Sequence, residues 1–333
     1  MQKIPSVTDL RNILILRGEG SLGDAIISSC CYRNIKQANP QVHISVVCFG
    51  AGYQFLKENP YIDRIIKLPI PKLIRPNQRW FTLIGYGIKL RKYHFDLVLD
   101  SSNKDYQNWR LFKWLAGADR VLDCFTSPVQ PFGALQKHGS LHECAILQIL
   151  GIKNPSTSYD LPVPPQDQQA VQTWLTQQQV PAYILLNPSG SIDKRRFSAQ
   201  TLKRLAALLA PFRQPIIIPS MPAMYAHWQE ATKDIPNVHV KKTGSVFELF
   251  EWVRRATLVI TPDTSVVHIA AGFSKPTLVF YNTLSVYNAP NNPHALIVET
   301  DRDDVNNCDW ALVQTQLEKL HTELTACAAH STK

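Results

Sequence analysis

The sequence has no apolar stretch of the ~18 residues that a membrane-spanning helix needs, and Met1 to Leu10 lack the apolar core of a signal peptide. Its seven cysteines are scattered without a C-x-x-C pair, which argues against both a disulfide framework and a zinc site. We therefore expect a cytoplasmic protein, peripheral to a membrane at most, whose cysteines mainly fill its core.

Several common catalytic signatures are also missing. No H-E-x-x-H, G-x-S-x-G or Walker A sequence occurs, so zincin, α/β-hydrolase and P-loop chemistry lack support. The stretch Asp301-Arg-Asp-Asp304 contains a D-x-D pattern, which can hold a divalent metal. Its position before the last expected helix suits a loop and a helix cap better, so we expect no metal site.

The chain of 333 residues is longer than one ordinary domain, and two domains of about 150 residues are expected. The net charge of +9 and the pI of about 9.2 favour an anionic partner. Nucleic acid, an acidic membrane surface and a phosphorylated substrate all fit this charge, and so does a merely soluble basic surface.

Short apolar runs alternate with helical patterns along the chain, which predicts parallel sheets covered by helices. The proline-rich, aperiodic stretch 153–168 is the candidate linker between two doubly wound halves. The carboxyl ends of the two sheets are expected to line a cleft. The expected strands are 13–16, 42–48, 62–66, 95–100, 183–186, 215–219, 238–240, 258–260 and 277–281. The expected helices are 25–29, 53–58, 78–94, 109–115, 167–178, 199–209, 223–232, 246–255, 266–272 and 310–325.

The most informative motif of the first half lies at residues 12–24. Their three glycines spell G-x-G-x-x-G between a strand and a helix, a pattern typical of a dinucleotide site. Such a site also needs an acidic residue that closes the second strand and holds the ribose, and here that strand runs into Phe49-Gly-Ala-Gly52. Asp24 would moreover repel a pyrophosphate. The loop is better suited to present Asp24 to a hydroxyl group of a ligand.

A second polar constellation, Thr261-Pro-Asp-Thr-Ser-Val-Val-His268, lies at a strand-to-helix turn of the second half. Thr264 and Ser265 can cap the helix and leave free N–H groups for an anion such as a diphosphate. An ordinary helix cap explains the same pattern. His268 is one turn into the helix, where a core or capping histidine is as plausible as a ligand-binding one.

The basic run Lys194-Arg195-Arg196 follows a Pro-Ser-Gly turn after a buried strand. Its charges are expected at the same sheet edge as Asp263, where they can neutralise a leaving diphosphate. A solvated charge run is the alternative. The helices expected at 78–94 and 109–115 mix basic and aromatic residues, which fits a membrane interface, a nucleic-acid groove, or packed helices whose charges face water.

Taken together, five segments resemble, in order, the motifs of the ADP-heptose:lipopolysaccharide heptosyltransferases, glycosyltransferase family nine. The resemblance spans residues 11 to 282. The segments are Ile13-Leu-Ile-Leu-Arg-Gly-Glu-Gly-Ser-Leu-Gly-Asp24, Asn59-Pro-x-x-Asp63, Phe95-Asp-Leu-Val-Leu-Asp100, Asn187-Pro-Ser-Gly with Lys194-Arg195, and Thr261-Pro-Asp-Thr-Ser-x-x-His268-x-Ala-Ala.

The resemblance implies an α/β GT-B fold, in which two Rossmann-like, doubly wound domains face each other across a cleft. Residues 1–160 would form the acceptor-binding domain and residues 161–333 the nucleotide-sugar domain, with the last helix a candidate to pack back on the first. The implied reaction is an inverting, metal-independent transfer of heptose from ADP-heptose to the lipopolysaccharide inner core, without a cofactor. It would take place at the cytoplasmic face of the inner membrane.

Carried over by position, Asp24 matches the family's catalytic base and Lys194 its phosphate-contacting lysine. The nucleotide-sugar loop matches Asp263, Thr264 and His268, while Ser189 and Ser265 lie in loops that approach the diphosphate. The implied partners are the nucleotide sugar, the lipopolysaccharide core and an anionic inner-membrane surface, and no nucleic acid.

Three positions depart from the family pattern. Ser265 replaces a glycine, Asn187-Pro-Ser-Gly replaces His-Pro-Gly, and Met224 occupies the place of a ribose-binding glutamate. Because these positions surround the donor, another nucleotide sugar and a non-catalytic, ligand-binding relative stay open as alternatives. A dehydrogenase and a nucleic-acid-binding protein are weaker ones.

Overall fold

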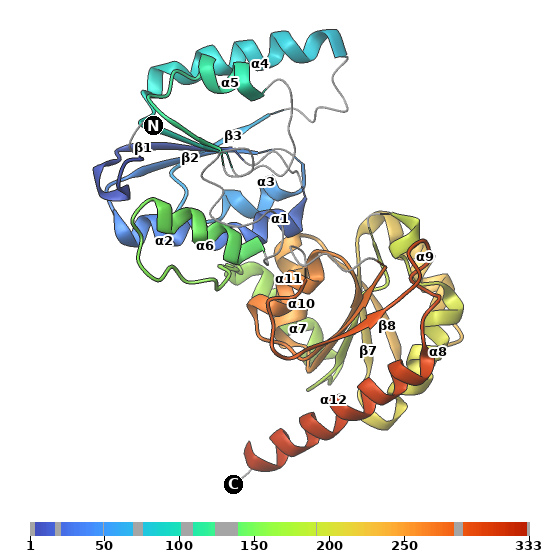
Figure 1. Ribbon diagram of the computed structural model, residues 1–333. Helices are drawn as coiled ribbons and strands as arrows, with labels where there is room; N and C mark the ends of the chain where they lie inside the picture. The colour runs from blue at the N-terminus through green and yellow to red at the C-terminus, as the bar shows by residue number, and fades with distance from the viewer. Residues whose placement is uncertain are drawn as a thin grey trace. The chain divides into compact units, whose positions relative to one another are not determined.

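The computed structural model describes residues 4–16, 21–48, 50–68, 76–100, 109–123, 139–190, 192–282 and 289–331 of the chain. The chain divides into two compact units, residues 1–160 and 161–333. Each unit is built on one parallel sheet with helices on its faces (Figure 1). The binding roles that the resemblance gives to the two domains stay predictions.

The sheet of the first unit has the strand order β3-β2-β1-β4-β5, and every pairing in it is parallel. The order reverses between β1 and β4, which is the doubly wound arrangement expected from the sequence. The strand β5 is only three residues long and is absent from the expected elements. The strands are β1 (Asn12–Leu16), β2 (His43–Cys48), β3 (Arg64–Lys67), β4 (Leu97–Asp100) and β5 (Val121–Asp123).

Helices cover both faces of this sheet. Helices α4 and α5 form the layer on one face, and α1, α2 and α6 lie on the other (Figure 1). The apolar side chains that join the sheet to α4 and α5 include Leu14, Val98 and Phe112, all fully buried. The helices are η1 (Val7–Asp9), α1 (Leu22–Ile27), α2 (Ser29–Ala38), α3 (Gly52–Lys57), α4 (Pro76–Leu90), η3 (Arg91–Tyr93), α5 (Trp109–Leu115) and α6 (Gly139–Ile149).

The second unit repeats this topology with one more strand, in the order β11-β10-β9-β6-β7-β8 and again all parallel. Its order reverses between β6 and β9. The strands are β6 (Ile184–Leu186), β7 (Ile216–Ser220), β8 (Val238–Lys242), β9 (Leu258–Pro262), β10 (Thr277–Tyr281) and β11 (Ala295–Glu299). The helices are α7 (Pro165–Gln177), η4 (Asp193–Arg195), α8 (Ala199–Leu209), η5 (Ala210–Phe212), η6 (Pro222–Met224), α9 (Tyr225–Thr232), α10 (Val246–Arg255), α11 (Ser265–Gly272) and α12 (Trp310–Ser331).

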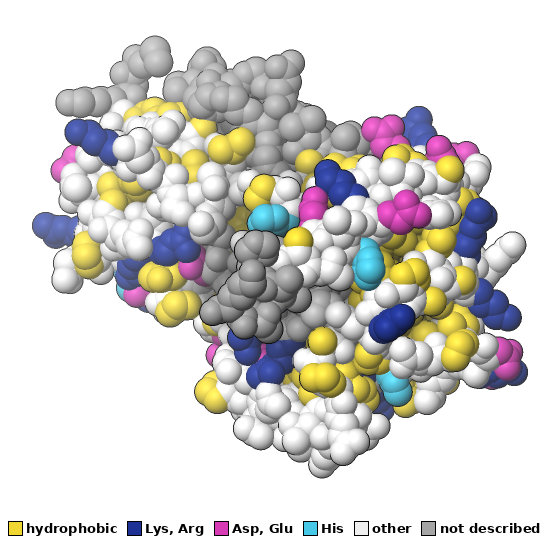
Figure 2. Space-filling model, turned by 90° about the horizontal axis from the view of Figure 1, so that it is seen from below, with side chains coloured by type: hydrophobic (Ala, Val, Ile, Leu, Met, Phe, Trp, Pro, Cys, Tyr) yellow, Lys and Arg dark blue, Asp and Glu magenta, His cyan; other side chains and the backbone are white. Residues whose placement is uncertain are grey.

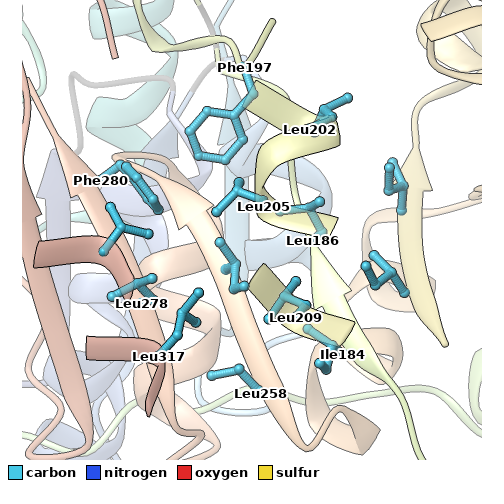
Figure 3. Packing of buried hydrophobic residues seen from close by; sticks show 14 of the residues in the cluster. Ile184, Leu186, Phe197, Leu202, Leu205, Leu209, Leu258, Leu278, Phe280 and Leu317 are labelled. Atoms are coloured by element: carbon cyan, nitrogen blue, oxygen red, sulfur yellow. The ribbon is translucent and has the colours of Figure 1, made fainter. Parts of the chain in front are cut away.

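The core of the second unit lies between one face of its sheet and the helices α8 and α12 (Figure 3). Phe197 and Phe280 meet edge to face with ring centroids 5.1 Å apart, a favoured aromatic geometry. Helix α12 contributes Val313, Leu317 and Leu320 to this core. Its first turns therefore belong to the second unit, and packing of the helix on the first unit stays a prediction.

The surface carries charges of both signs. On the face drawn in Figure 2, Lys and Arg side chains are interspersed with acidic and uncharged ones. Within the described ranges, no helix combines the length and the apolar character that a membrane span requires.

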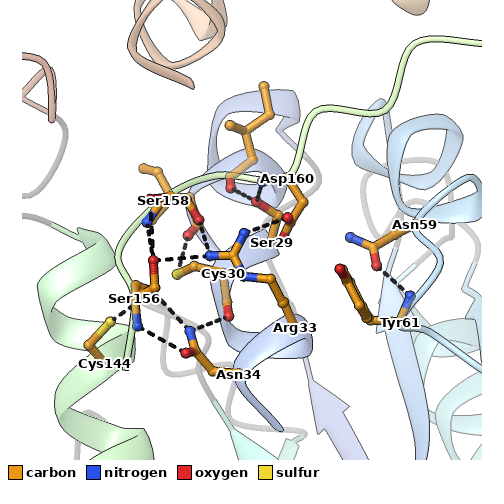
Figure 4. Close-up of polar contacts among 12 residues, drawn as sticks. Ser29, Cys30, Arg33, Asn34, Asn59, Tyr61, Cys144, Ser156, Ser158 and Asp160 are labelled. Carbon is orange, nitrogen blue, oxygen red and sulfur yellow. Dashed lines mark hydrogen bonds and ion pairs between the residues drawn. The ribbon is translucent and has the colours of Figure 1, made fainter. Parts of the chain in front are cut away.

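The first part of the expected linker is fastened to the first unit (Figure 4). Arg33 of α2 forms an ion pair with Asp160 at 2.5 Å and donates to the Ser158 carbonyl at 2.8 Å. Asn34 exchanges two hydrogen bonds of 2.9 Å with the backbone of Ser156. The prediction of a linker over 153–168 was therefore too long, because side chains of α2 satisfy the polar backbone of 156–160 and α7 already begins at Pro165.

A buried ion pair on α10 yields a prediction about stability. The Glu251 side chain is completely buried and accepts hydrogen bonds from Arg254 at 2.6 Å and from Arg255. Burial by itself raises the pKa of Glu251, but the two guanidinium groups outweigh it and leave that pKa below its ordinary value. Since the folded-state pKa is lowered, the ionised carboxylate stabilises the fold above the unfolded-state value of roughly 4.3 and loses this effect as the pH falls through the folded value.

Replacing Glu251 with glutamine is expected to lower the free energy of unfolding by about 2 kcal/mol at pH 7, because two half-exposed arginines lose their counter-charge. The difference from the wild type should shrink in acid. Urea unfolding monitored by tryptophan fluorescence at pH 7 and below pH 4 measures both values. An equal difference at the two pH values would contradict the ionic explanation.

Candidate functional site

Asp24 lies in the first turn of α1, a short distance along the chain from the end of β1. Ser21 caps this helix: its hydroxyl accepts a hydrogen bond of 3.1 Å from the Asp24 N–H and donates one to the Asp24 carboxylate. A carboxylate at this end of a helix is favoured by the helix dipole. The expected strand and helix on either side of the glycine loop are confirmed, and residues 17–20 of that loop lie outside the described residues.

The acid that ends β4 forms a buried ion pair. Asp100 is opposite Leu16 in the register of β4 and β1, so it lies at the carboxyl edge where the strand order reverses. The Lys113 ammonium of α5 lies 2.7 Å from its carboxylate, and both side chains are buried. The pair joins α5 to the end of the sheet.

The motif Asn59-Pro-x-x-Asp63 supports the sheet. Asp63 accepts a hydrogen bond of 2.7 Å from the Ile44 N–H of β2 and forms an ion pair of 2.8 Å with Lys36 of α2. Burial raises the pKa of Asp63, but these contacts outweigh it and leave the pKa below its ordinary value. Asn59 accepts a bond of 3.0 Å from the Tyr61 N–H, which shapes the turn.

In the second unit, the loops after β6 and β9 meet where the strand order reverses, the usual position for a ligand in such sheets. The buried Asn187 of the first loop donates to the hydroxyl groups of Thr261 at 2.9 Å and of Thr264 at 3.1 Å. Those two hydroxyls are themselves hydrogen-bonded at 3.1 Å. The asparagine side chain therefore joins the two loops.

The loop after β6 also contacts Trp228 of α9 and the helix η4. The indole N–H of the fully buried Trp228 donates to the Ser189 hydroxyl at 3.0 Å. A Cβ atom added to Gly190 would lie 2.2 Å from the Arg195 carbonyl oxygen and 2.5 Å from the Arg195 Cβ. Only glycine therefore allows the loop to pack this closely on η4.

The basic run of η4 turns different side chains in different directions. The Arg195 guanidinium lies 2.9 Å from the Asp263 carboxylate and donates to the Asp263 carbonyl at 3.2 Å. The Lys194 amine instead lies 3.4 Å from Asp303. The sequence placed the whole run 194–196 at this edge, and of the two cations of η4 it is Arg195 that contacts Asp263. The phosphate contact that the resemblance gives to Lys194 stays a prediction. In a 3₁₀-helix neighbouring side chains point about 120° apart, so the run alone cannot show which of them faces the loop.

Asp263, the residue after β9, is buried, and this burial raises its pKa above the ordinary value. The Arg195 guanidinium acts in the opposite direction. Thr264 caps α11, accepting from the Val266 N–H at 3.3 Å. Ser265, the first residue of α11, is half-buried. His268 is buried, as are Asn187 and Asp263, and its contact with a nucleotide sugar stays a prediction.

The D-x-D stretch stabilises its own loop. Asp301 accepts from the Asp303 N–H at 3.0 Å, and Asp304 accepts from the Asn306 N–H at 2.9 Å. Across the ranges that the structure describes, no group of three or more His, Cys, Asp or Glu side chains is arranged to hold a metal ion.

Comparisons with known proteins agree with one another. The sequence profile described as "Glycosyltransferase family 9 (heptosyltransferase)" matches residues 135–309. A protein of Escherichia coli K12 named "Putative lipopolysaccharide heptosyltransferase 4" is 24 % identical over 299 residues, which cover 84 % of this chain and 76 % of that protein.

Solved structures show the same fold at low sequence identity. A glycosyl transferase of family 9 from Veillonella parvula superposes with a TM-score of 0.78 at 18 % identity, covering 94 % of this chain and 98 % of that one. The E. coli heptosyltransferase WaaC, solved with ADP, gives 0.68 at 17 % identity, covering 95 % and 99 %. The E. coli ADP-heptose lipopolysaccharide heptosyltransferase II gives 0.68 at 15 %, covering 94 % and 99 %. The expected α/β fold of GT-B type is confirmed.

Proposed function

Because this chain belongs to glycosyltransferase family 9, the heptosyltransferase family, we propose that it transfers a heptose from ADP-heptose to the inner core of lipopolysaccharide. The observation that carries the proposal is the family match over 135–309, more than half of the chain. This stretch contains both loops that Asn187 joins at the edge of the second sheet. A nucleotide sugar is the substrate in this proposal, and no cofactor takes part.

In the proposed reaction, Asp24 takes the proton of an acceptor hydroxyl while that oxygen attacks the anomeric carbon. The bond from the anomeric carbon to the diphosphate oxygen breaks, and ADP leaves from the opposite face of the sugar with inversion. The position of Asp24 in the first turn of α1 supports this role, because the Ser21 hydroxyl that caps the helix also donates to the carboxylate and orients it.

The leaving diphosphate gains charge and needs preorganised donors. We assign this role to Arg195, Thr264 and Ser265 at the start of α11, with Lys194 at longer range. Ser189 and Asp263 orient the loops around the donor, and His268 supports α11 from within. The ion pair between Arg195 and Asp263 supports the assignment, since it keeps a guanidinium next to the N-terminal, positive end of the α11 helix dipole.

The acceptor is proposed to bind the first unit and the nucleotide sugar the second. A phosphorylated, lipid-anchored core attracts a chain of net charge +9. The net positive charge also favours binding of the enzyme to the anionic, cytoplasmic surface of the inner membrane. The proposal includes no nucleic acid as a partner.

The test is a transfer assay with ADP-heptose and a panel of truncated core lipopolysaccharides, read by mass spectrometry. A product one heptose heavier than its acceptor is expected for at least one member of the panel. If no acceptor gains mass from ADP-heptose while a UDP or GDP sugar yields product, the proposed donor is wrong. If no donor reacts, the proposed activity is wrong, and the chain is better explained as a non-catalytic protein that binds nucleotide sugar.

One observation favours the same chemistry with another nucleotide sugar as a second candidate. Met224, which stands where the resemblance expects a ribose-binding glutamate, packs against the hydrophobic core of the second unit. A thioether cannot accept the two hydroxyl hydrogen bonds that a carboxylate takes from a ribose. Competition by ADP, UDP and GDP against a fluorescent nucleotide separates the candidates, and ADP is expected to bind most tightly.

The two cations of η4 are expected to differ in importance. Replacing Arg195 with methionine should lower kcat/KM by roughly 100-fold, the usual loss for one donor to a developing anion. Replacing Lys194 with methionine should lower it by less than about fivefold, because its amine is half-exposed and directed to Asp303. Steady-state kinetics with varied donor measures both. A larger loss for Lys194→Met would favour the assignment based on the sequence alone.

A further inference from the structure

Helix α4 exposes large apolar side chains on its outer side. Phe81 is 77 % and Ile88 53 % exposed, and their spacing of seven residues, two helical turns, puts them on one side of the helix. The other side, with Leu83, Tyr86 and Leu90, packs on the core of the first unit. Trp114 of the adjoining helix α5 is 72 % exposed as well. Isolated apolar residues are ordinary on a surface, but three large ones on two packed helices indicate a binding surface.

Three of the described cations lie on α4 and η3, in segments that lack acidic residues. The segments Pro76–Tyr93 and Trp109–Leu115 contain no aspartate or glutamate. Lys89, Arg91 and Lys92 are exposed. The Lys92 amine lies 5.0 Å from the centre of the Tyr93 ring, and the Lys89 amine lies 5.8 Å from that of Tyr86.

An aromatic ring holds a cation in place without neutralising it, unlike a carboxylate. Cations elsewhere do face carboxylates, as Arg254 and Arg255 face Glu251. Within the described residues, the outer side of α4 and η3 therefore combines positive charge, on segments without acidic residues, with exposed apolar groups. We call the set Phe81, Ile88, Lys89, Arg91 and Lys92 the α4 face.

We propose that the α4 face docks on an anionic lipid bilayer, with Phe81 and Ile88 entering the boundary between head groups and acyl chains. The charge complementarity selects this partner: a helix that lies in a membrane interface has apolar side chains on one side and lysine or arginine beside them. Each such cation strengthens binding to an anionic leaflet roughly fivefold. This proposal rests on the proposed function, because an enzyme whose acceptor is anchored in lipid must work at the membrane surface.

The test is co-sedimentation of the full chain with vesicles that contain no acceptor, made either of phosphatidylethanolamine with phosphatidylglycerol or of phosphatidylcholine alone. At least tenfold tighter binding to the anionic vesicles is expected, and it should weaken with salt. The double variants Phe81→Ser/Ile88→Ser and Lys89→Glu/Lys92→Glu should each lose at least tenfold. The matched control Leu312→Ser/Lys319→Glu changes an exposed pair on α12 and should bind like the wild type.

Equal binding to the two vesicle types, or wild-type binding by both α4 variants, would overturn the proposal. So would a dimer in sedimentation velocity that Phe81→Ser/Ile88→Ser dissociates, because the face would then hold a second copy of the chain. Transfer to a soluble, de-acylated acceptor should stay within twofold of the wild type in both variants. If the wild type transferred no heptose in that assay, the proposed function would be wrong. The vesicle experiment would still show whether the α4 face binds anionic lipid.

Discussion

Replacing Asp24 with asparagine is expected to lower kcat for transfer by about 1,000-fold, within the range that a general base contributes. The amide keeps the shape of the side chain and can still be held by Ser21, but it cannot accept the proton of the acceptor hydroxyl. The KM for the donor should change by less than about twofold, because Asp24 acts on the acceptor rather than on the diphosphate. Single-turnover kinetics with saturating acceptor measures the chemical step directly.

The matched control for this change is Ser21→Ala, which removes the cap but leaves the carboxylate. It should cost about 1 kcal/mol of stability and far less activity than Asp24→Asn. Comparable losses of kcat in the two variants would show that the capped geometry of the helix, and not the basicity of Asp24, limits the reaction.

Replacing Gly190 with alanine is expected to raise the KM for the donor at least tenfold and to destabilise the fold by about 2 kcal/mol. The new Cβ would overlap backbone and Cβ atoms of Arg195, and neither can move aside as a flexible chain end could. Relief of the overlap must shift η4, which moves the Arg195 guanidinium away from Asp263. Thermal unfolding and donor titration measure the two effects.

Gly85 of α4 provides the control for this experiment. A Cβ added there meets no atom within 4 Å, so Gly85→Ala should be neutral or should stabilise the helix by up to about 1 kcal/mol. If Gly190→Ala behaved like Gly85→Ala in both assays, close packing between the loop and η4 would not be needed for donor binding.

Much of the fold follows from the sequence because its segments carry strong local signals. Helix α10 runs from Val246 to Arg255 as expected, since Ser245 caps it and apolar residues recur on one side. Strand β10 likewise has its expected bounds, because the apolar run Leu278 to Tyr281 follows Thr277 in a buried parallel sheet. By contrast, the three residues of β5 are too few to show a period of their own.

Less of the candidate site than of the fold could be predicted from the sequence. The pattern Thr261 to His268 correctly predicted a strand, a turn and a helix capped by Thr264. It could not predict that Asn187 joins this turn to a loop 74 residues earlier, because that contact depends on the order of strands in the sheet. The choice between Lys194 and Arg195 depends on side-chain direction in a single helical turn, which no spacing rule fixes.

The bridge that Asn187 makes between the two loops also bears on the entropy of binding. A flexible loop must lose conformational freedom before it can hold a phosphate, and that loss weakens the complex. Here the loops after β6 and β9 are joined by hydrogen bonds within the chain, from Asn187 to Thr261 and Thr264. If the donor binds at this edge, as proposed, these hydrogen bonds reduce the conformational entropy that the two loops must lose on binding.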